Sequence, residues 1–230
     1  DADDDTMSRI QVYANSWFGT RKDSTAIHGV TPIVGNANVV TRFRSNHYVD
    51  FTSGGVLNGS GIVQITPNAS DKSVSIDTYD FISGEADFSA WGLNSLDSSF
   101  SQLEVGNDLS NGLYSDKVLT LNNKAILSSG SGALNLTGSV AATNLDIELK
   151  AGSGVGSVST LSLGTGGLEK SGSGCITLTG TNTYTGATTI NGGTLAVSGS
   201  LADTTVVDVA SGATYQVAAS DTIGGLQGAG

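Results

Sequence analysis

A short alternating motif recurs along this chain of 230 residues and limits the folds open to it. The motif reads glycine, any residue, apolar, polar, apolar, threonine, and its copies lie at residues 60–66, 131–137 and 173–179. The second and third copies are 42 residues apart, and related segments follow at intervals of about 19 and 20 residues, at 193–198 and 214–217. The chain therefore contains an internal repeat of about 20 residues, and a shift of 42 is close to two units.

Each repeat is too small to fold alone. Alternation with a period of two residues predicts a strand that buries one face and exposes the other, and glycine at the end of the unit permits the positive φ of a sharp corner. A unit of this size can bury its apolar face only by stacking on its neighbours. Further short strands are expected at 188–190, 206–209 and 222–223. Two or three strands per unit predict an all-β fold, a parallel β-helix or solenoid.

An antiparallel β-sandwich is the alternative to the β-helix, because it would use tight turns such as Asn-Gly. Asn58-Gly59, Asn111-Gly112 and Asn191-Gly192 could supply hairpins of this kind. The regular spacing of the repeats favours the β-helix.

Composition excludes several other classes of protein. Glycine accounts for 32 residues and only 13% of residues are charged, so the residues that favour helices are scarce. The net charge of -11 disfavours nucleic acid as a partner, and no apolar run reaches the roughly 18 to 20 residues that span a bilayer. Disorder is disfavoured because 38% of residues are hydrophobic and alternate with polar ones. Cys175 is the single cysteine, so no internal disulfide can form.

The two halves of the chain differ in composition, with the change near Asp116-Lys117. All six Phe, both Trp, four of the six Tyr, both His and all four Arg lie at or before Tyr114. Residues 1–116 are therefore expected to form an aromatic-rich N-terminal cap or the early coils of the β-helix, and residues 117–230 a repetitive stalk.

One segment, residues 168–198, has a more specific pattern. It contains Asn182-Thr-Tyr-Thr-Gly186 followed by Thr189-Ile-Asn-Gly-Gly-Thr-Leu195. This segment resembles the passenger-associated transport repeat of bacterial autotransporters, also called the autotransporter-associated β-strand repeat. Cys175 stands where that repeat commonly has threonine. The resemblance covers about 30 residues, and residues 1 to about 110 resemble no family.

The resemblance implies a right-handed parallel β-helix that is secreted or displayed on the surface of a Gram-negative bacterium. In that family a C-terminal β-barrel helps the passenger across the outer membrane, and the repeat is thought to assist export and folding. No series of alternating barrel strands follows the repeat, and Asp1-Ala-Asp-Asp-Asp5 is unlike a positively charged leader. We therefore expect a piece of a longer protein, or a smaller secreted protein that reuses the repeat.

Aromatic and arginine residues in the first half form the strongest candidate binding patch, because both side chains stack on sugars and contact proteins. Its members are Trp17, Phe18, Arg21, Arg42, Arg44 and Tyr48. The alternative is that aromatic residues such as Phe43, Phe51 and Phe81 plug the open first coil of the β-helix.

Carboxylates give two weaker candidates. Calcium could bind the run Asp1, Asp3, Asp4 and Asp5, although the full calcium-loop pattern is missing and a solvated acidic terminus is the simpler interpretation. Paired acids of a polysaccharide-active enzyme could come from Asp77, Asp80, Glu85 and Asp87, which otherwise are exposed loop acids. His28 and His47 have no metal-ligand spacing. No catalytic residue and no other cofactor is assigned.

Three functions remain open at this level. The first is a non-enzymatic stalk and adhesion segment that acts in cell-surface contact or biofilm formation, with like chains or host and cell-surface glycans and proteins as partners. The second is a subunit of an extracellular filament or layer, in which Thr222, Ile223 and Leu226 of the last coil stack head-to-tail on the next subunit. The third is a polysaccharide-active β-helix enzyme.

Overall fold

The computed structural model describes residues 17–21, 24–28, 40–45, 48–50, 61–67, 72–76, 86–88, 93, 96 and 98–229. Side chains are described from residue 61 onward within these ranges, apart from 86–88. The run Asp1 to Asp5, His47 and the acids Asp77, Asp80 and Glu85 lie outside the described residues.

The strands form two sheets. Sheet A has 12 strands, namely β1 (Trp17–Arg21), β2 (Ser24–His28), β4 (Tyr48–Asp50), β6 (Val74–Ile76), β7 (Ala86–Phe88), β9 (Leu113–Ser115), β10 (Leu119–Leu121), β12 (Leu134–Ala142), β14 (Val155–Ser162), β16 (Cys175–Leu178), β18 (Thr194–Val197) and β20 (Thr214–Val217). Sheet B has 9 strands, namely β3 (Val40–Ser45), β5 (Ile62–Pro67), β8 (Gln102–Val105), β11 (Ala125–Gly130), β13 (Ile147–Ala151), β15 (Leu168–Ser171), β17 (Thr188–Ile190), β19 (Val206–Val209) and β21 (Gly225–Gly228).

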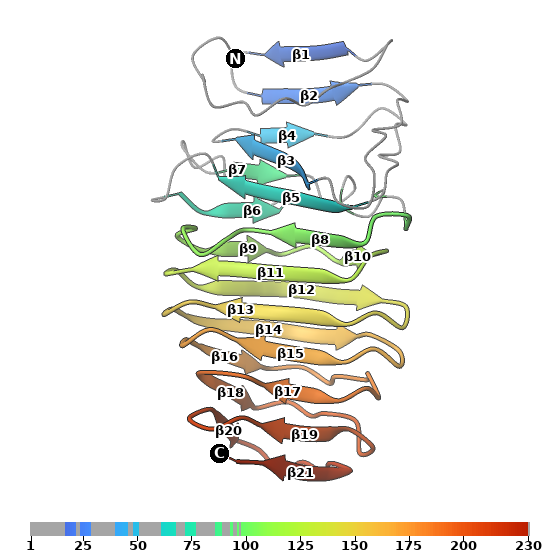
Figure 1. The fold of residues 1–230 in the computed structure, drawn as a ribbon, viewed down its shortest axis with the longest axis vertical. Helices are drawn as coiled ribbons and strands as arrows, with labels where there is room; N and C mark the ends of the chain where they lie inside the picture. The colour runs from blue at the N-terminus through green and yellow to red at the C-terminus, as the bar shows by residue number, and fades with distance from the viewer. Residues whose placement is uncertain are drawn as a thin grey trace.

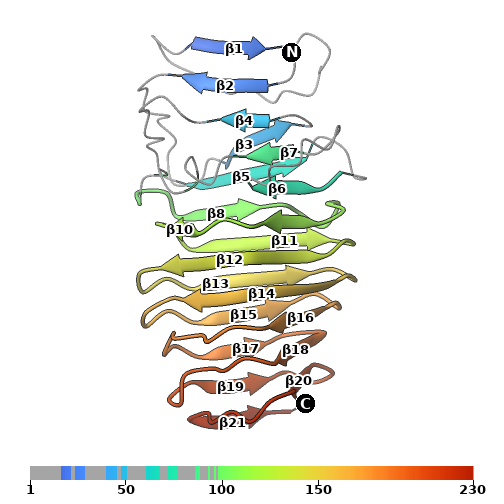
Figure 2. The same ribbon diagram turned by 180° about the vertical axis from the view of Figure 1, so that it is seen from behind.

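The chain winds as a parallel solenoid. From β11 onward successive strands alternate between the two sheets, and each strand pairs in parallel with the strand one coil away. In Figure 1 the front strands run to the left and the rear strands to the right as the chain descends, which is the right-handed sense, and Figure 2 shows the same from behind. The predicted right-handed parallel β-helix is confirmed. Among the described residues, no helix is long and apolar enough to cross a membrane.

Asn111-Gly112 and Asn191-Gly192 turn corners of the solenoid, so the sandwich alternative is wrong, and Asn58-Gly59 lies outside the described residues. Asn111-Gly112 precedes β9 of sheet A after β8 of sheet B, and Asn191-Gly192 joins β17 of sheet B to β18 of sheet A. A hairpin turn would join neighbouring strands of one sheet. Antiparallel pairing occurs between β1 and β2 at the N-terminal end, where Arg21 faces Ser24 across a two-residue connection.

The repeat has the predicted length. Leu136 pairs with Val158 and Val158 with Leu178, so the 42-residue shift spans two coils. Coils shorten along the chain, from 22 residues between Leu103 and Ala125 to 19 between Val207 and Leu226.

Two details of the repeat differ from the prediction. The copy at 60–66 lies in sheet B, whereas the copies at 131–137 and 173–179 lie in sheet A, because the same alternating pattern suits a strand of either sheet. The strand expected at 222–223 is wrong: these residues precede β21, which begins at Gly225. The strands expected at 188–190 and 206–209 are β17 and β19.

The interior is filled by columns of side chains, one from each coil. Leu127, Leu149, Lys170 and Ile190 form one column of sheet B, and all four side chains are buried. Apart from Lys170 these are aliphatic, and full burial of such a side chain contributes about 1.5 to 3 kcal/mol. A third side of the coils that contain β12 and β14 comes from the second halves of these long strands, where Val140 and Leu161 pair and are buried.

Parallel pairing continues across residue 116, because β9 pairs with β12 and β8 with β11. The division into 1–116 and 117–230 stays a prediction.

Gly156 marks a close backbone approach in the interior. It follows Leu134 and precedes Ile176 in an inward column of sheet A, and a Cβ at this position would lie 2.2 Å from the carbonyl oxygen of Leu134. We expect Gly156→Ala to lower the free energy of unfolding by about 1 to 3 kcal/mol through overpacking. Gly225→Ala is the control, since its Cβ would meet only side-chain atoms at 3.9 Å. Equal urea midpoints for the two variants would contradict this expectation.

Candidate functional site

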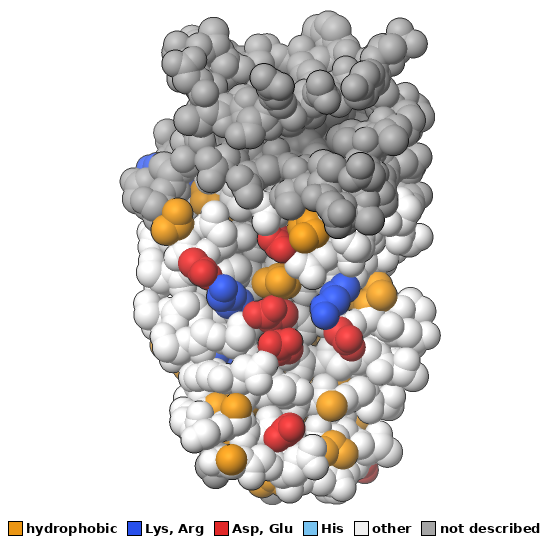
Figure 3. All heavy atoms as spheres, viewed as in Figure 1, with side chains coloured by type: hydrophobic (Ala, Val, Ile, Leu, Met, Phe, Trp, Pro, Cys, Tyr) orange, Lys and Arg blue, Asp and Glu red, His pale blue; other side chains and the backbone are white. Residues whose placement is uncertain are grey.

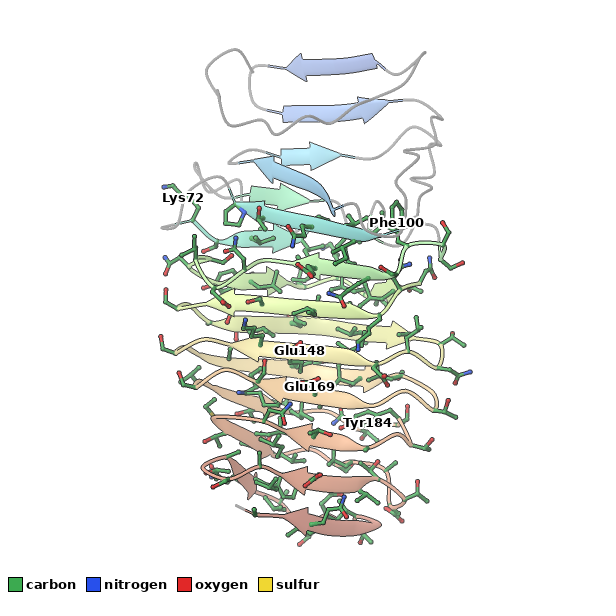
Figure 4. The ribbon with its side chains drawn as sticks, viewed as in Figure 1. Lys72, Phe100, Glu148, Glu169 and Tyr184 are labelled. Atoms are coloured by element: carbon green, nitrogen blue, oxygen red, sulfur yellow. The ribbon has the colours of Figure 1, made fainter. Side chains whose placement is uncertain are left out.

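The outer face of sheet B carries a column of charged and polar side chains. Glu148 and Glu169 are paired on β13 and β15 and point outward one above the other (Figure 4). The same column continues through Ile126 to Glu104 on one side and through Thr189 to Asp208 on the other. Figure 3 shows acidic side chains down the centre of this face, with lysine side chains on both sides. In-register stacking therefore brings Glu148 and Glu169 together, and Ile126 and Thr189 separate this pair from Glu104 and Asp208 in the same column, which we call the acidic ladder.

Polar partners on the next coil hold these carboxylates in place. Asn191 Nδ2 donates to Glu169 Oε1 at 2.7 Å, and Ser171 Oγ donates to Glu148 Oε1. Within strand β8, Gln102 Nε2 donates to Glu104 Oε1 at 2.6 Å. Carboxylates on adjacent strands repel one another, and the hydrogen bonds from Asn191 and Ser171 offset the repulsion of Glu148 and Glu169 while tying consecutive coils together.

The edges of this face carry opposite charge. Lys150 Nζ lies 2.7 Å from Asp108 Oδ1 in a partly exposed ion pair. Among the described residues, no group of three or more His, Cys, Asp or Glu side chains is placed to hold a metal ion. The ladder presents carboxylate oxygens on the outer sheet face, and those of Glu148 and Glu169 come from adjacent strands, which are about 4.8 Å apart.

The outer face of sheet A differs in character. Its column of outward residues is Asn135, Ser157, Thr177, Ala196 and Gln216. These are uncharged and mostly small, and Asn135 Oδ1 accepts the backbone N–H of Ser157 at 3.1 Å. The solenoid thus presents one charged face and one neutral face.

A hollow of about 440 Å³ lies on the third side of the coils. Thr120, Asn122, Thr143, Leu145 and Ser162 contribute to its lining. Small polar and apolar side chains mix here, and the lining includes no carboxylate.

The predicted aromatic and arginine patch divides between the two sheets. Trp17, Phe18 and Arg21 belong to β1 and Tyr48 begins β4, both in sheet A, while Arg42 and Arg44 belong to β3 in sheet B. Only the backbone of these strands is described, so the patch stays a prediction. The calcium hypothesis for Asp1, Asp3, Asp4 and Asp5 concerns residues outside the described ranges.

The predicted assembly residues lie in the last described coil. Leu226 pairs with the buried Val207, so it occupies an inward position, and it is 65% exposed. Ile223 packs partly against the core and Thr222 is exposed. The role of Thr222, Ile223 and Leu226 in assembly stays a prediction.

Buried polar residues in the repeat segment were not singled out by sequence reasoning. Asn182 is 1% exposed. Its Oδ1 accepts the backbone N–H of Leu161 at 2.9 Å, and its Nδ2 donates to the carbonyl oxygens of Gly180 at 3.0 Å and Ser200 at 2.9 Å. One buried amide therefore links three consecutive coils.

Tyr184 is the second of these residues and fills the interior two positions further on. Its hydroxyl lies 2.7 Å from Thr188 Oγ1, and its carbonyl oxygen accepts a hydrogen bond from Thr205 Oγ1 of the next coil at 3.1 Å. Burial raises the pKa of the Tyr184 hydroxyl well above its ordinary value. The Asn-x-Tyr pattern was visible in the sequence, and its alternation with threonine is the signal for two inward side chains.

Lys170 is the third residue, and its side chain is fully buried. Its Nζ donates to the carbonyl oxygens of Ser171 at 2.7 Å, Gly172 at 3.0 Å and Gly192 at 3.0 Å. Burial lowers the pKa of Lys170 to about 8, and the nearby Cys175 acts in the opposite direction. The signal in the sequence is a lysine at the inward position of the alternating run Leu168-Glu-Lys170.

Comparison with known proteins agrees with this geometry. Residues 168–197 match the family model of the passenger-associated-transport-repeat, so the resemblance predicted for 168–198 is confirmed. The chain is also 32% identical over 148 residues to the adhesin BmaC autotransporter of Brucella suis biovar 1 (strain 1330). This match covers 60% of the chain and 4% of that relative, so the chain spans a small part of its length. No solved structure matches the chain.

Asn182→Ala tests the buried amide. We expect it to lower the free energy of unfolding by about 1 to 3 kcal/mol, because the N–H of Leu161 loses its buried acceptor, whereas the carbonyl of Ser200 keeps the backbone N–H of residue 182. Asn191→Ala removes an exposed asparagine with one hydrogen bond, to Glu169, and is expected to cost less than about 1 kcal/mol. Urea unfolding of both variants measures the difference, and similar losses would argue against the role of Asn182.

The lowered pKa of Lys170 predicts that the free energy of unfolding depends on pH. The folded chain releases this proton near pH 8, whereas the unfolded chain retains it to about 10.5. Between these pH values the unfolded state binds more protons than the folded state, so the free energy of unfolding rises with pH, by about 1 to 3 kcal/mol. Below pH 8 this group makes no contribution to the pH dependence. Lys170→Met should therefore lose the rise, while Cys175→Ser, which removes the neighbouring thiol, retains it. A rise that persists in Lys170→Met contradicts the prediction.

Proposed function

We propose that this chain is a non-enzymatic segment of a surface-displayed or secreted autotransporter passenger, and that it acts in adhesion. The observation that carries the proposal is the coincidence of a transport repeat with a continuous parallel solenoid whose outer faces are flat and polar. Support also comes from the similarity to an adhesin autotransporter. The placement on the outer surface of a Gram-negative cell follows from the same two comparisons.

The geometry explains how such a segment would adhere. Paired backbone groups and aliphatic columns give a stiff rod, and each coil adds one more row of outward side chains to both sheets. Contacts that are individually weak then repeat along the rod, and their combined avidity exceeds the affinity of any one row. Charged rows supply specificity and association rate more than raw affinity, which makes the face of sheet B the preferred contact surface. The partners that fit are cell-surface glycans and proteins or a second copy of the chain.

A non-enzymatic role is the better fit to the described carboxylates. Glu148 and Glu169 stand side by side on an open sheet face and accept hydrogen bonds from Asn191 and Ser171. A glycosidase instead places two carboxyl groups on either side of the bond to be cleaved. Release of reducing ends from polysaccharides by the purified chain would contradict this part of the proposal.

Adhesion can be measured with beads that carry the purified chain on cultured cell monolayers. Coated beads are expected to bind well above albumin-coated beads. The double variant Glu148→Gln/Glu169→Gln keeps shape and removes charge, and it is expected to reduce binding at least threefold. The control Thr177→Ala/Gln216→Ala alters the neutral face of sheet A and should leave binding within about 30% of the original, since rim and surface changes of this kind are near neutral.

The outcomes separate the parts of the proposal. Binding no better than that of albumin beads would overturn the adhesion function. Binding that both double variants reduce equally would overturn the assignment to sheet B alone. Sedimentation velocity over a concentration series checks the filament alternative, which requires growth of large species that charges at Ile223 and Leu226 abolish.

A further inference from the structure

The corner from sheet B to sheet A loses one residue between two consecutive coils. Lys170 pairs with Ile190 in sheet B, 20 positions on, whereas Cys175 pairs with Thr194 in sheet A, 19 positions on. The shortening therefore falls between these pairs, in the corners 171–174 and 191–193. Gly193 has a φ of 64° at this point, a conformation that glycine adopts without strain.

This shortening interrupts the backbone hydrogen bonds of the corner. One coil earlier, the N–H of Ser173 donates to the carbonyl of Gly152 at 2.9 Å, and that of Gly174 to Ala151 at 3.1 Å. Within the part of the chain that the structure describes, no such backbone bond reaches the carbonyls of Gly172 or Gly192. These corner residues are only partly buried, and carbonyl groups that point away from solvent need a donor from elsewhere.

The ammonium group of Lys170 is that donor. Its three hydrogen bonds, at 2.7, 3.0 and 3.0 Å, go to the carbonyls of Ser171, Gly172 and Gly192. Two of these belong to the coil of Lys170 and the third to the next coil. An ammonium has three donors and no acceptor, so all its donors are used, and the side chain has 0% exposure.

We propose that the carbonyl oxygens of Ser171, Gly172 and Gly192 form an interior cation site for an alkylammonium group, which the chain fills with its own Lys170. The head group clamps the coil of residues 168–178 to the coil of residues 188–197 where the corner shortens. The chemistry that recognises the ligand is three carbonyl acceptors that match its three N–H donors beside the buried neighbours Leu149 and Ile190. These hydrogen bonds hold the group against the burial of its charge, which lowers the pKa of Lys170.

A competing account holds that the buried Lys170 destabilises the folded chain. Removing a charge from the interior and replacing it with a hydrophobic side chain of similar volume often stabilises a protein. The two accounts predict opposite signs for the change in the free energy of unfolding caused by Lys170→Met. The site predicts destabilisation because the carbonyls of Gly172 and Gly192 lose their donor.

Urea unfolding of the whole chain at pH 7 gives the first test. We expect Lys170→Met to raise the unfolding equilibrium constant at least tenfold. The control is Lys150→Met on the neighbouring strand, which loses a partly exposed ion pair with Asp108 and should change the constant less than threefold. A Lys170→Met variant as stable as the parent, or more stable, overturns the proposal.

Chemical rescue gives the second test. Lys170→Ala removes the atoms of a propylammonium ion, so n-propylammonium chloride is expected to lower the unfolding constant of this variant at least fivefold. 1-Propanol and sodium chloride at the same concentration, and the parent chain with n-propylammonium, serve as controls and should show less than a twofold change. Rescue by 1-propanol to the same extent would show an apolar cavity and overturn the cation site.

The rescue also works if Lys170→Ala does not fold by itself. In that case circular dichroism should show recovery of β-structure with n-propylammonium and not with 1-propanol. Failure of both ligands to restore structure counts against the site, because an open cation site would bind the ion it has lost.

Discussion

In-register stacking of coils is the constraint on which this structure depends. A single coil of about 20 residues has one apolar side and unpaired backbone groups along both edges, and each neighbour supplies the missing partner for both. The register between coils then determines which side chains meet inside the rod and which meet on its surface. Inward residues of successive coils form aliphatic columns such as Leu127, Leu149 and Ile190, and outward residues form ladders such as Glu148 and Glu169. The same repetition that builds the core therefore builds the surface.

The most distinctive residues of the transport repeat are inside the rod. Lys170, Asn182 and Tyr184 are buried, and each bonds to a neighbouring coil through backbone carbonyls or amides. Lys170 lies in β15 next to a corner, and Asn182 and Tyr184 lie between β16 and β17. The characteristic residues of the repeat therefore stabilise the stacking of coils. The residues available to a partner are the outward ones that alternate with these buried residues. Folding and the proposed adhesion use alternate positions of the same strands.

Sequence reasoning located most of the fold and little of the site. The alternating runs at 188–190 and 206–209 and the 42-residue shift gave strands and coil length, because a period of two residues is a direct consequence of strand geometry. Sequence reasoning misplaced the strand near 222–223, where Gly224 and Gly225 interrupt the alternation of apolar and polar residues from which strands are predicted. The acidic ladder could not be foreseen, because Glu104, Glu148, Glu169 and Asp208 are scattered in the sequence and meet only once the register is known. Lys170 was overlooked since a charged residue between apolar ones is ordinarily assigned to the surface.

Changes in coil length fall at corners and at local register shifts such as Ser128 to Gly130 of β11 and Leu136 to Ser139 of β12, and this has an evolutionary consequence. A residue inserted in a strand would turn every following side chain to the opposite face. At the corner between Lys170 and Cys175 one residue is lost, and at Ser128 to Gly130 the register also shifts, yet the columns of both sheets continue. The circumference of the rod can therefore drift from coil to coil while its two faces keep their identities. A lineage of such proteins can lengthen, shorten and redecorate its coils by small steps, without passing through a form that has lost its core.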